Sequence, residues 1–442
     1  MIAAGAALAA ATLLAVVAVV SNRPDTEPVV IPDPGDVRSA DSVVDSMGVA
    51  VQLYQQSEHY ELLATTLGDL GVRHIRTGGQ GASFFGHVNE LHEEHGIKTL
   101  LVMDPREGYT GGNVVSTGLL PVLDAADGVE GPNEWDINRD LEYQGQNWPD
   151  GVLGFADEMH DSMKNYEDDD GRVQEAVRGL SVVSPSVANP DATSALTDVR
   201  CDVAAMHSYP GGQLPDQDLT TKWMPAALQM CDGKGVISTE SGYCNTLTPE
   251  GCTGQGGVSE RASAKYALRH YLEYFRAGVE RDYLYNLSTD DWDEFLDADG
   301  KRKPAFYAVR NLIDLLQDPG ATFHPSRFDI SVSAADESGA PVDDVHHVLV
   351  QKRDGSYWLA LWTNAISYPA GEECCDVETE RSVTVELPRS MSSTVYEPTF
   401  SATAAVDTAA ASPSLTLTVP DSVLLVRLDD APPTPVPASA GS

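Results

Sequence analysis

Basic side chains are scarce in this sequence. Its 442 residues contain 28 Lys and Arg against 67 Asp and Glu, which gives a formal net charge of -39 at pH 7. A surface of this sign repels phosphate backbones, so we expect no nucleic-acid partner. The acidity fits life in salt or a need for solubility, and the 42% of hydrophobic residues is typical of a soluble globular protein.

Cysteine is also sparse, and none of the 6 cysteines has the spacing of a zinc site. We therefore expect no metal, and nothing in the sequence implies a cofactor. The cysteine count fits an exported protein that carries disulfides. Cys201 and Cys231 each precede a predicted strand, so they can pair if those strands are neighbours. Cys244 and Cys252 bracket a loop that a disulfide would staple, and the adjacent cysteines at 374–375 pair with each other or with nothing.

Only one long apolar run occurs, at residues 2–20, which are mostly Ala, Val and Leu. Its length is close to the roughly 20 residues that span a bilayer, although no basic residue precedes it. We expect residues 1–21 to form a signal peptide or a membrane anchor, and residues 22–41 an acidic, Pro-rich spacer. The chain is therefore predicted to be extracellular, either secreted or tethered to a membrane by this segment.

Strand-like and helix-like segments alternate from about residue 47 to residue 316. Continuous apolar strands that alternate with helices favour a parallel sheet covered by helices. We count about eight such strands, which suits a closed (β/α)8 TIM barrel of roughly 250 residues. The sequence therefore predicts an α/β protein with a catalytic barrel at residues 42–318.

The pattern changes after Leu316. Segments 348–351 and 358–362 flank Asp354-Gly355, a typical hairpin signal, and further strands are expected near residues 383–387, 415–419 and 423–426. Short strands joined by turns favour an antiparallel β-sandwich, which we assign to residues 319–430. Residues 431–442 are rich in Pro and Ala, and we expect a disordered tail there.

Several polar side chains directly follow predicted strands, and in a barrel the active site lies at these carboxyl ends. They are Arg76, Glu134, His207, Tyr209 and Glu240. Cleavage of a glycosidic bond with retention needs two carboxyl groups about 5 Å apart, one to protonate the leaving oxygen and one to attack the anomeric carbon. Glu134 and Glu240 end strands four and seven, which face each other obliquely across a barrel mouth. We predict that these two carboxyl groups meet there.

Five short segments resemble glycoside hydrolases of clan A, which are retaining glycosidases on a (β/α)8 barrel. Gly131-Pro132-Asn133-Glu134 resembles the strand-four motif, in which Asn precedes the acid/base Glu. Thr239-Glu240 resembles the strand-seven nucleophile. Met206-His207-Ser208-Tyr209 is similar to the strand-six segment whose Tyr bonds the nucleophile, and Val72 to Arg76 to the strand-two segment whose Arg supports it. The segment 303–307 is similar to the helix start that often follows strand eight.

The resemblance covers roughly residues 47–428 and is strongest for the families of xylosidases, iduronidases and heparanase-type glucuronidases. It implies a retaining glycoside hydrolase that cleaves O-glycosidic bonds of a poly- or oligosaccharide through a glycosyl-enzyme intermediate. It also implies that Glu134 is the general acid/base and Glu240 the nucleophile. Asn133 would bond the sugar hydroxyl next to the anomeric carbon, where such bonds strengthen in the transition state.

Four further residues complete the predicted site. Arg76, Tyr209 and His207 would hold the nucleophile ionised and aligned. Trp292 follows the last barrel strand and would stack on a sugar face, because an aromatic ring presents an apolar platform. Each of the four also has a purely structural interpretation, as an ion-pair or packing residue. For the whole chain the alternatives are a non-catalytic carbohydrate-binding barrel at the cell surface and a structural surface protein, and the intact pair of glutamates favours the enzyme.

Overall fold

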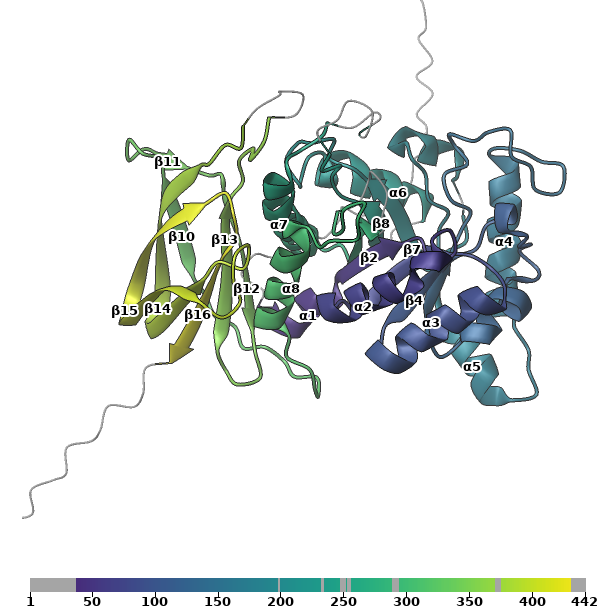
Figure 1. Cartoon of the computed structure of the whole chain (residues 1–442), viewed down its shortest axis with the longest axis horizontal. Helices are drawn as coiled ribbons and strands as arrows, with labels where there is room; N and C mark the ends of the chain where they lie inside the picture. The colour runs from purple at the N-terminus through teal and green to yellow at the C-terminus, as the bar shows by residue number, and fades with distance from the viewer. Residues whose placement is uncertain are drawn as a thin grey trace, which may run out of the picture.

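The computed structural model describes residues 37–197, 199–231, 234–246, 252, 256–287, 294–369 and 375–430. The expected leader, most of the spacer, the expected C-terminal tail and Trp292 lie outside the described residues. The chain forms two modules that lie side by side, a helix-covered barrel and a sheet module without helices (Figure 1).

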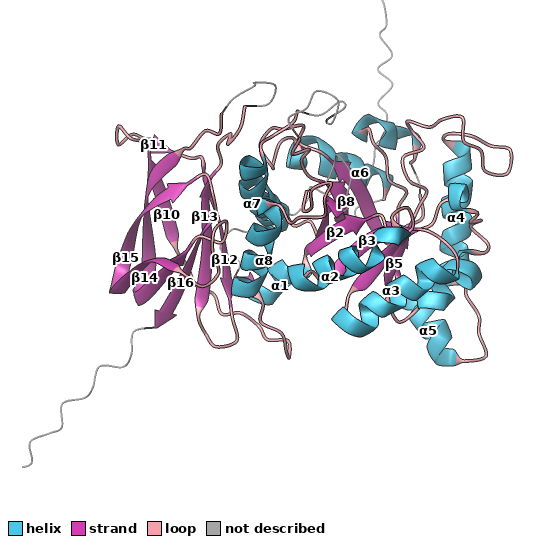
Figure 2. Ribbon diagram, viewed as in Figure 1, coloured by secondary structure: helices cyan, strands magenta, loops and turns pink. Residues whose placement is uncertain are grey.

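The first module is a closed barrel of parallel strands in sequential order, in which β9 pairs with β2. Its strands are β2 (Met47–Val51), β3 (His74–Gly78), β4 (Lys98–Val102), β5 (Ala126–Glu130), β6 (Ser181–Val183), β7 (Val203–Ser208), β8 (Gly235–Ser241) and β9 (Arg281–Leu287). They are almost entirely buried, as the continuous apolar segments of the sequence predict for a sheet covered on its outer face. The predicted TIM barrel is therefore confirmed (Figure 2).

Helices surround the barrel (Figure 2). Among the described residues they are α2 (Tyr60–Leu70), α3 (Ala82–His95), α4 (Asp150–Lys164), α5 (Gly171–Gly179), α6 (Met224–Met230), α7 (Glu260–Ala277) and α8 (Pro304–Leu316), with short turns η1 (Ser57–His59), η2 (Pro105–Glu107), η3 (Val114–Leu119), η4 (Leu120–Val122), η5 (Pro190–Ala195) and η6 (Leu219–Trp223). In α2 the leucines at 63, 67 and 70 share one buried face, as their helical spacing predicts. The helix ends where Gly71 takes a left-handed conformation.

The second module is a mainly antiparallel sheet with its own apolar core. It contains β10 (Ser331–Ala335), β11 (Pro341–Val342), β12 (Val345–Gln351), β13 (Tyr357–Thr363), β14 (Glu380–Tyr396), β15 (Ala405–Pro420) and β16 (Leu424–Asp430). The hairpin predicted around Asp354-Gly355 is present, because β12 and β13 pair on either side of it and Gly355 has a φ of 91°. The predicted C-terminal β-sandwich is confirmed.

The first described strand of the chain belongs to the sheet module. Strand β1 (Arg38–Ser39) pairs with β12 in parallel, helix α1 (Ala40–Asp45) follows, and the next residues form the first barrel strand. The side chain of Ser39 caps α1 by accepting a hydrogen bond from the N–H of Ser42. A short N-terminal segment thus contacts both modules before the barrel begins.

Helix α7 lies beside the sheet module (Figure 1). Its side chains form buried polar contacts with that module. Lys265 donates to both carboxylate oxygens of Asp421 at 2.9 Å. Arg269, which is fully buried, donates to the carbonyl oxygen of Ala365 at 2.9 Å and to Oδ1 of Asn364 at 2.9 Å. Because each buried charge has partners from the other module, the two modules are held in one arrangement.

The described residues include the disulfides Cys201–Cys231 and Cys244–Cys252, so both predicted pairings are confirmed. Residue 374 of the third expected pair lies outside the described residues. Disulfides are typical of proteins that fold in an oxidising compartment. Within the described ranges, every helix is too short or too polar to cross a bilayer.

Candidate active site

The loop after β5 places Asn133 and Glu134 at the carboxyl end of the barrel. Gly131 permits this path: it has a φ of 156°, and a Cβ there would lie 2.0 Å from the carbonyl oxygen of Met103. The N–H of Glu134 donates to the carbonyl oxygen of Ser186 at 3.0 Å, which ties the loop to the end of β6. Glu134 itself has a φ of 52°, in the left-handed region that non-glycine residues rarely adopt, and such strain is concentrated at functional sites.

Asp104, which follows β4, supports the same loop from the other side. Its Oδ2 accepts hydrogen bonds from the N–H of Asn133 at 2.9 Å and from the indole N–H of Trp135 at 3.2 Å. Its carboxylate also pairs with Arg106, whose Nη2 donates to the carbonyl oxygen of Asn133 at 2.6 Å. The side chain of Trp135 is itself almost fully buried.

Glu240 lies near the end of β8 and is bonded through both carboxylate oxygens. Nη1 of Arg76 donates to Oε1 at 2.6 Å, and the hydroxyl of Tyr209 donates to Oε2 at 2.8 Å. Glu240 is 8% exposed, so these donors act in a largely water-excluded environment. The two hydrogen bonds fix the position of both carboxylate oxygens.

Arg76 connects the two predicted catalytic strands. Besides Glu240 it bonds the buried carboxylate of Glu130, with Nε to Oε2 at 2.6 Å and Nη2 to Oε1 at 3.0 Å, and Nη2 also donates to Oδ1 of Asn133 at 2.6 Å. Burial alone disfavours the charged guanidinium, but Glu130 and Glu240 outweigh it and raise the pKa of Arg76. The guanidinium therefore stays charged and orients three acceptors at once.

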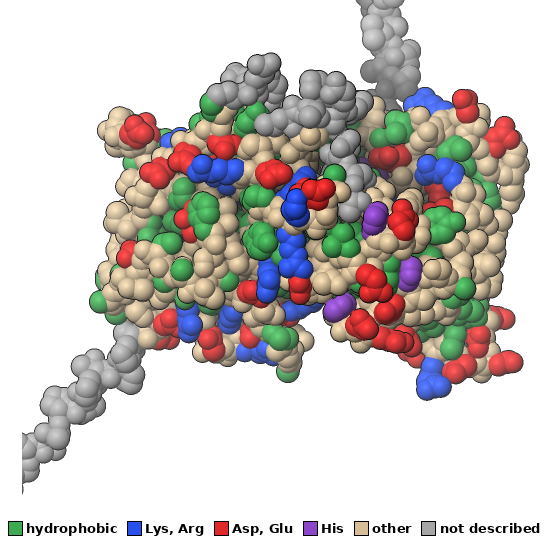
Figure 3. Space-filling view, viewed as in Figure 1, with side chains coloured by type: hydrophobic (Ala, Val, Ile, Leu, Met, Phe, Trp, Pro, Cys, Tyr) green, Lys and Arg blue, Asp and Glu red, His purple; other side chains and the backbone are tan. Residues whose placement is uncertain are grey.

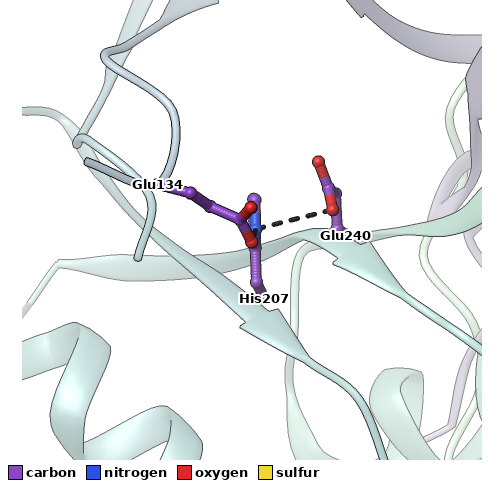
Figure 4. Close-up of side chains that lie close together, drawn as sticks. All are labelled: Glu134, His207 and Glu240. Atoms are coloured by element: carbon purple, nitrogen blue, oxygen red, sulfur yellow. Dashed lines mark hydrogen bonds and ion pairs between the residues drawn. The ribbon is translucent and has the colours of Figure 1, made fainter. Parts of the chain in front are cut away.

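His207 lies between the two glutamates (Figure 4). Its Nδ1 is 2.7 Å from Oε1 of Glu134 and 3.6 Å from Oε2 of Glu240. Burial lowers the pKa of His207, but Glu240 and Glu134 more than compensate and raise it. Burial likewise raises the pKa of Glu134, but the hydrogen bond and charge of His207, with Arg76 and Arg106, bring it below the usual range. The two pKa shifts share one cause, the short contact between Nδ1 of His207 and Oε1 of Glu134.

The two carboxyl groups are close together. One oxygen of Glu134, one oxygen of Glu240 and one ring nitrogen of His207 all lie within 4.8 Å of one another. Retaining glycosidases hold their carboxyl groups about 5–5.5 Å apart and inverting enzymes about 6.5–9.5 Å apart. The nearest oxygens of Glu134 and Glu240 are thus closer to each other than the inverting range. Three such groups also resemble a metal site, but Arg76 and Tyr209 already bond the oxygens of Glu240, which favours a hydrogen-bonded carboxylate over a metal ligand.

A pocket of about 420 Å³ opens beside this cluster and is lined by Glu240, Arg76 and Asn133. Its other lining residues are Ala50, Val51, Gln52, Tyr54, Gln55, Thr77, Gly78, Val102, Asp104, Arg106, Glu107 and Tyr285. The volume is within the range of small-molecule sites, about 300–1,000 Å³.

The structure brings together all the predicted site residues that it describes. These are Arg76, Asn133, Glu134, His207, Tyr209 and Glu240. One contact differs from the expectation, since His207 hydrogen-bonds Glu134 and only approaches Glu240. The sequence interpretation overlooked Glu130, Asp104 and Glu107. Glu130 ends β5 and Asp104 lies two residues after β4, so the strand-end rule could have found both, whereas Glu107 lies further along the chain, in turn η2.

No protein-family model matches the chain, and no curated protein sequence matches it. Among solved structures, an arabinofuranosidase of glycoside hydrolase family 51 from Xanthomonas axonopodis pv. citri superposes with a TM-score of 0.51 at 13% identity, covering 83% of this chain and 89% of that one. A family 30 subfamily 8 xylanase from Clostridium acetobutylicum gives 0.49 at 12% identity, covering 87% and 96%. The first superposition confirms the predicted resemblance to clan A as one of fold, a barrel followed by a β-sandwich.

Proposed function

We propose that this chain is a retaining glycoside hydrolase that cleaves O-glycosidic bonds of a poly- or oligosaccharide through a glycosyl-enzyme intermediate. One observation carries the proposal: oxygens of Glu134 and Glu240 lie within 4.8 Å of each other, beside a pocket at the carboxyl end of the barrel. Two carboxyl groups at this separation suit a double displacement, because no room remains between them for a water molecule that attacks directly.

In this proposal Glu240 is the nucleophile. Its carboxylate attacks the anomeric carbon while the bond to the leaving oxygen breaks, so a glycosyl ester forms on one carboxylate oxygen. Arg76 and Tyr209 hold the carboxylate ionised and fixed before attack. Asn133, which Arg76 orients, binds the hydroxyl next to the anomeric carbon, where charge develops in the transition state.

Glu134 is the general acid/base, and it shares one proton with His207. In the resting site the proton lies on Nδ1 of His207, which donates to Oε1 of Glu134 across 2.7 Å. Transfer along this bond lets Glu134 protonate the leaving oxygen. The proton departs with the leaving group, so His207 and Glu134 no longer share it and Glu134 is a carboxylate. Glu134 then takes a proton from the water that hydrolyses the ester.

The proposed setting is extracellular. Two disulfides support an exported protein. The apolar residues 2–20, which lie outside the described residues, suit a leader or a membrane tether. We propose that the enzyme is secreted or anchored by this segment and acts on carbohydrate outside the cell.

A mechanism-based label tests the proposal. A panel of 2-deoxy-2-fluoroglycosyl fluorides is incubated with the protein, and peptide mass spectrometry locates any adduct. We expect one adduct, on Glu240, and none in Glu240→Gln. Glycan binding without an adduct would contradict the enzyme and favour a non-catalytic carbohydrate-binding barrel. An adduct on Glu134 instead would reverse the two roles.

A further inference from the structure

The pocket beside Glu240 contains no uncommitted cation among its described lining residues. Its basic side chains are Arg76 and Arg106. The first is bonded to two glutamates, and the second is bonded to Asp104 through Nε and Nη2, each at 2.9 Å. The two guanidinium groups that could pair with a negatively charged sugar are therefore already hydrogen-bonded to protein carboxylates. Burying an anion without a partner of its own is costly.

The same pocket carries a carboxyl group that the proposed mechanism does not use. Glu107 is half-buried in turn η2, and its Oε2 accepts the N–H of Gly79 at 3.0 Å. Its Oε1 lies against Gly78, where a Cβ would be only 2.8 Å away, so the absence of a side chain at Gly78 lets the carboxyl group approach the end of β3. Within the described part of the chain, no hydrogen bond satisfies Oε1.

The carboxyl group of Glu107 would be stabilised by further hydrogen-bond donors. Burial, with the charge of Asp104, raises the pKa of Glu107 to about 7, because its single backbone donor and the nearby Arg106 and Arg76 offset only part of the cost. Sugar hydroxyl groups are neutral donors of the kind it lacks. Three further lining residues carry amide, phenol or aromatic groups: Gln52 donates to the hydroxyl of Tyr285 at 2.7 Å, and Tyr54 is 52% exposed. Amide, phenol and aromatic groups suit the polar rim and apolar face of a sugar.

We propose that the pocket binds an uncharged sugar and that Glu107 accepts a hydrogen bond from one of its hydroxyl groups. The inference rests on the proposed glycosidase function and narrows its substrate class. A uronic acid in this pocket would place its carboxylate near those of Glu107 and Glu240. The overall charge acts in the same direction, because a chain with a net charge of -39 repels acidic polysaccharides at long range.

The first test compares neutral and acidic substrates on the wild-type protein. The 4-nitrophenyl glycosides of glucose, galactose, mannose, xylose and arabinofuranose are assayed against the glucuronide and galacturonide. We expect kcat/KM on the best neutral glycoside to exceed that on either uronide by about a hundredfold, since like charges placed side by side cost several kcal/mol. A uronide that is cleaved faster than every neutral glycoside would overturn the inference and leave the glycosidase function standing. No cleavage of any glycoside, together with no label on Glu240, would overturn both.

The second test removes the charge of Glu107 and keeps its shape. Glu107→Gln is expected to raise KM for the best neutral glycoside about tenfold to hundredfold, the value of a hydrogen bond to a charged group, with kcat changed much less. The matched control is Glu93→Gln, an exposed residue of α3, which should leave both constants unchanged. An unchanged KM in Glu107→Gln, with the melting temperature of the wild type, would overturn the role of Glu107. If that variant does not fold, the comparison of neutral and acidic substrates still decides the substrate class.

Discussion

At the scale of single residues, Arg76 organises the site. One buried guanidinium contacts Glu130, Glu240 and Asn133 at 2.6–3.0 Å, so it sets the position of the proposed nucleophile and of a proposed substrate-binding amide together. Glu130 takes up two of the guanidinium N–H groups and also accepts the hydroxyl of Thr239 at 3.1 Å. The proposed catalytic glutamates thus depend on a third glutamate that does not reach the substrate.

The roles of the two glutamates differ, and substitution should separate them. Glu240→Ala is expected to abolish turnover because no carboxylate remains to form the glycosyl ester, and added azide should restore activity with an inverted product. Glu134→Ala should slow substrates with poor leaving groups by about 10²–10⁴-fold and spare those with good ones, which need no protonation. Kinetics on aryl glycosides of graded leaving-group pKa measure both effects.

Two results would contradict these assignments. Equal loss on all leaving groups in Glu134→Ala would argue against its role as the acid. Azide rescue with retained configuration in Glu240→Ala would argue against its role as the nucleophile. Glu58→Ala, on the exposed turn η1, is the control and should behave as the wild type.

At the scale of elements, the sequence predicted the strands and the residues at their ends, but it did not predict which side chains meet. Apolar continuity identified the barrel strands, and the polar residues that follow them share one end because parallel strands do. The partner of His207 depends on side-chain directions across the barrel, which spacing along the chain does not encode. Glu130 also stands at a strand end, but nothing in the sequence indicates that Arg76 and Thr239 bond its side chain.

The same contrast appears in the sheet module. Strands β12 and β13 were predicted from strong apolar runs around a turn, whereas β10 (Ser331–Ala335) was not. It consists of small residues, Ser, Val and Ala, and most of them are exposed or half-buried, so neither alternation nor aromatic content marks it. Residues 331–335 form a strand because they pair with β14, and their own sequence does not indicate this pairing.

The loop between β5 and Glu134 should tolerate no side chain at Gly131. Gly131→Ala places a Cβ 2.0 Å from the carbonyl oxygen of Met103, so the loop must move and carry Asn133 and Glu134 with it. We expect kcat/KM to fall about a hundredfold, as for a misplacement of about 1 Å. The control is Gly86→Ala in α3, where a Cβ meets nothing within 4 Å. Loss of activity in both variants, or in neither, would contradict this role for the loop.

The segment between β9 and α8 contains a buried acid whose titration should be visible in stability. Glu294 is fully buried against α7, where Ser263 donates to its carboxylate, and burial raises its pKa from 4.5 to about 7. A carboxyl whose pKa is raised on folding contributes stability below pH 4.5, and this contribution is lost as the pH rises towards 7.

Glu294→Gln removes that titration. The unfolding free energy of the wild type minus that of the variant should therefore fall by about 3 kcal/mol between pH 4.5 and pH 8, from 1.36 kcal/mol per pKa unit. Urea unfolding at a series of pH values measures it. The exposed Glu93→Gln should show no such trend. A constant difference across the series would mean that Glu294 titrates near its ordinary value.

At the scale of the whole molecule, charged side chains are arranged differently on the surface and in the interior. Asp and Glu side chains are spread over both modules on the face seen in Figure 3, as the net charge of -39 requires. Inside, some of the charged side chains form ion pairs. The contact between α7 and the sheet module contains the fully enclosed pair of Lys265 and Asp421, and Ser367 also donates to this Asp at 2.6 Å.

This buried pair should be the most sensitive point of the interface between the modules. Asp421→Ala leaves the ammonium of Lys265 without its partner in a site with 4% side-chain exposure, so we expect a loss of about 3–5 kcal/mol in unfolding free energy. Replacing both residues, with Lys265→Met and Asp421→Leu together, removes the stranded charge and should recover most of that loss. Urea unfolding followed by tryptophan fluorescence measures all variants, because Trp362 lies at the same interface and donates to Glu273 of α7 at 2.8 Å.

An exposed Lys–Asp pair tests whether burial, and not pairing alone, causes the expected loss of stability. Lys301 and Asp299 are 2.8 Å apart with side chains 72% and 75% exposed, and Asp299→Ala should leave stability nearly unchanged because water and salt screen the pair. If both single substitutions had equal effects, burial would not be what makes the pair of Lys265 and Asp421 matter. If the double variant were no more stable than Asp421→Ala, the loss would come from packing and not from a stranded charge. The interface would then be held by shape, and its buried charges would not be needed to keep the barrel and the sheet module together.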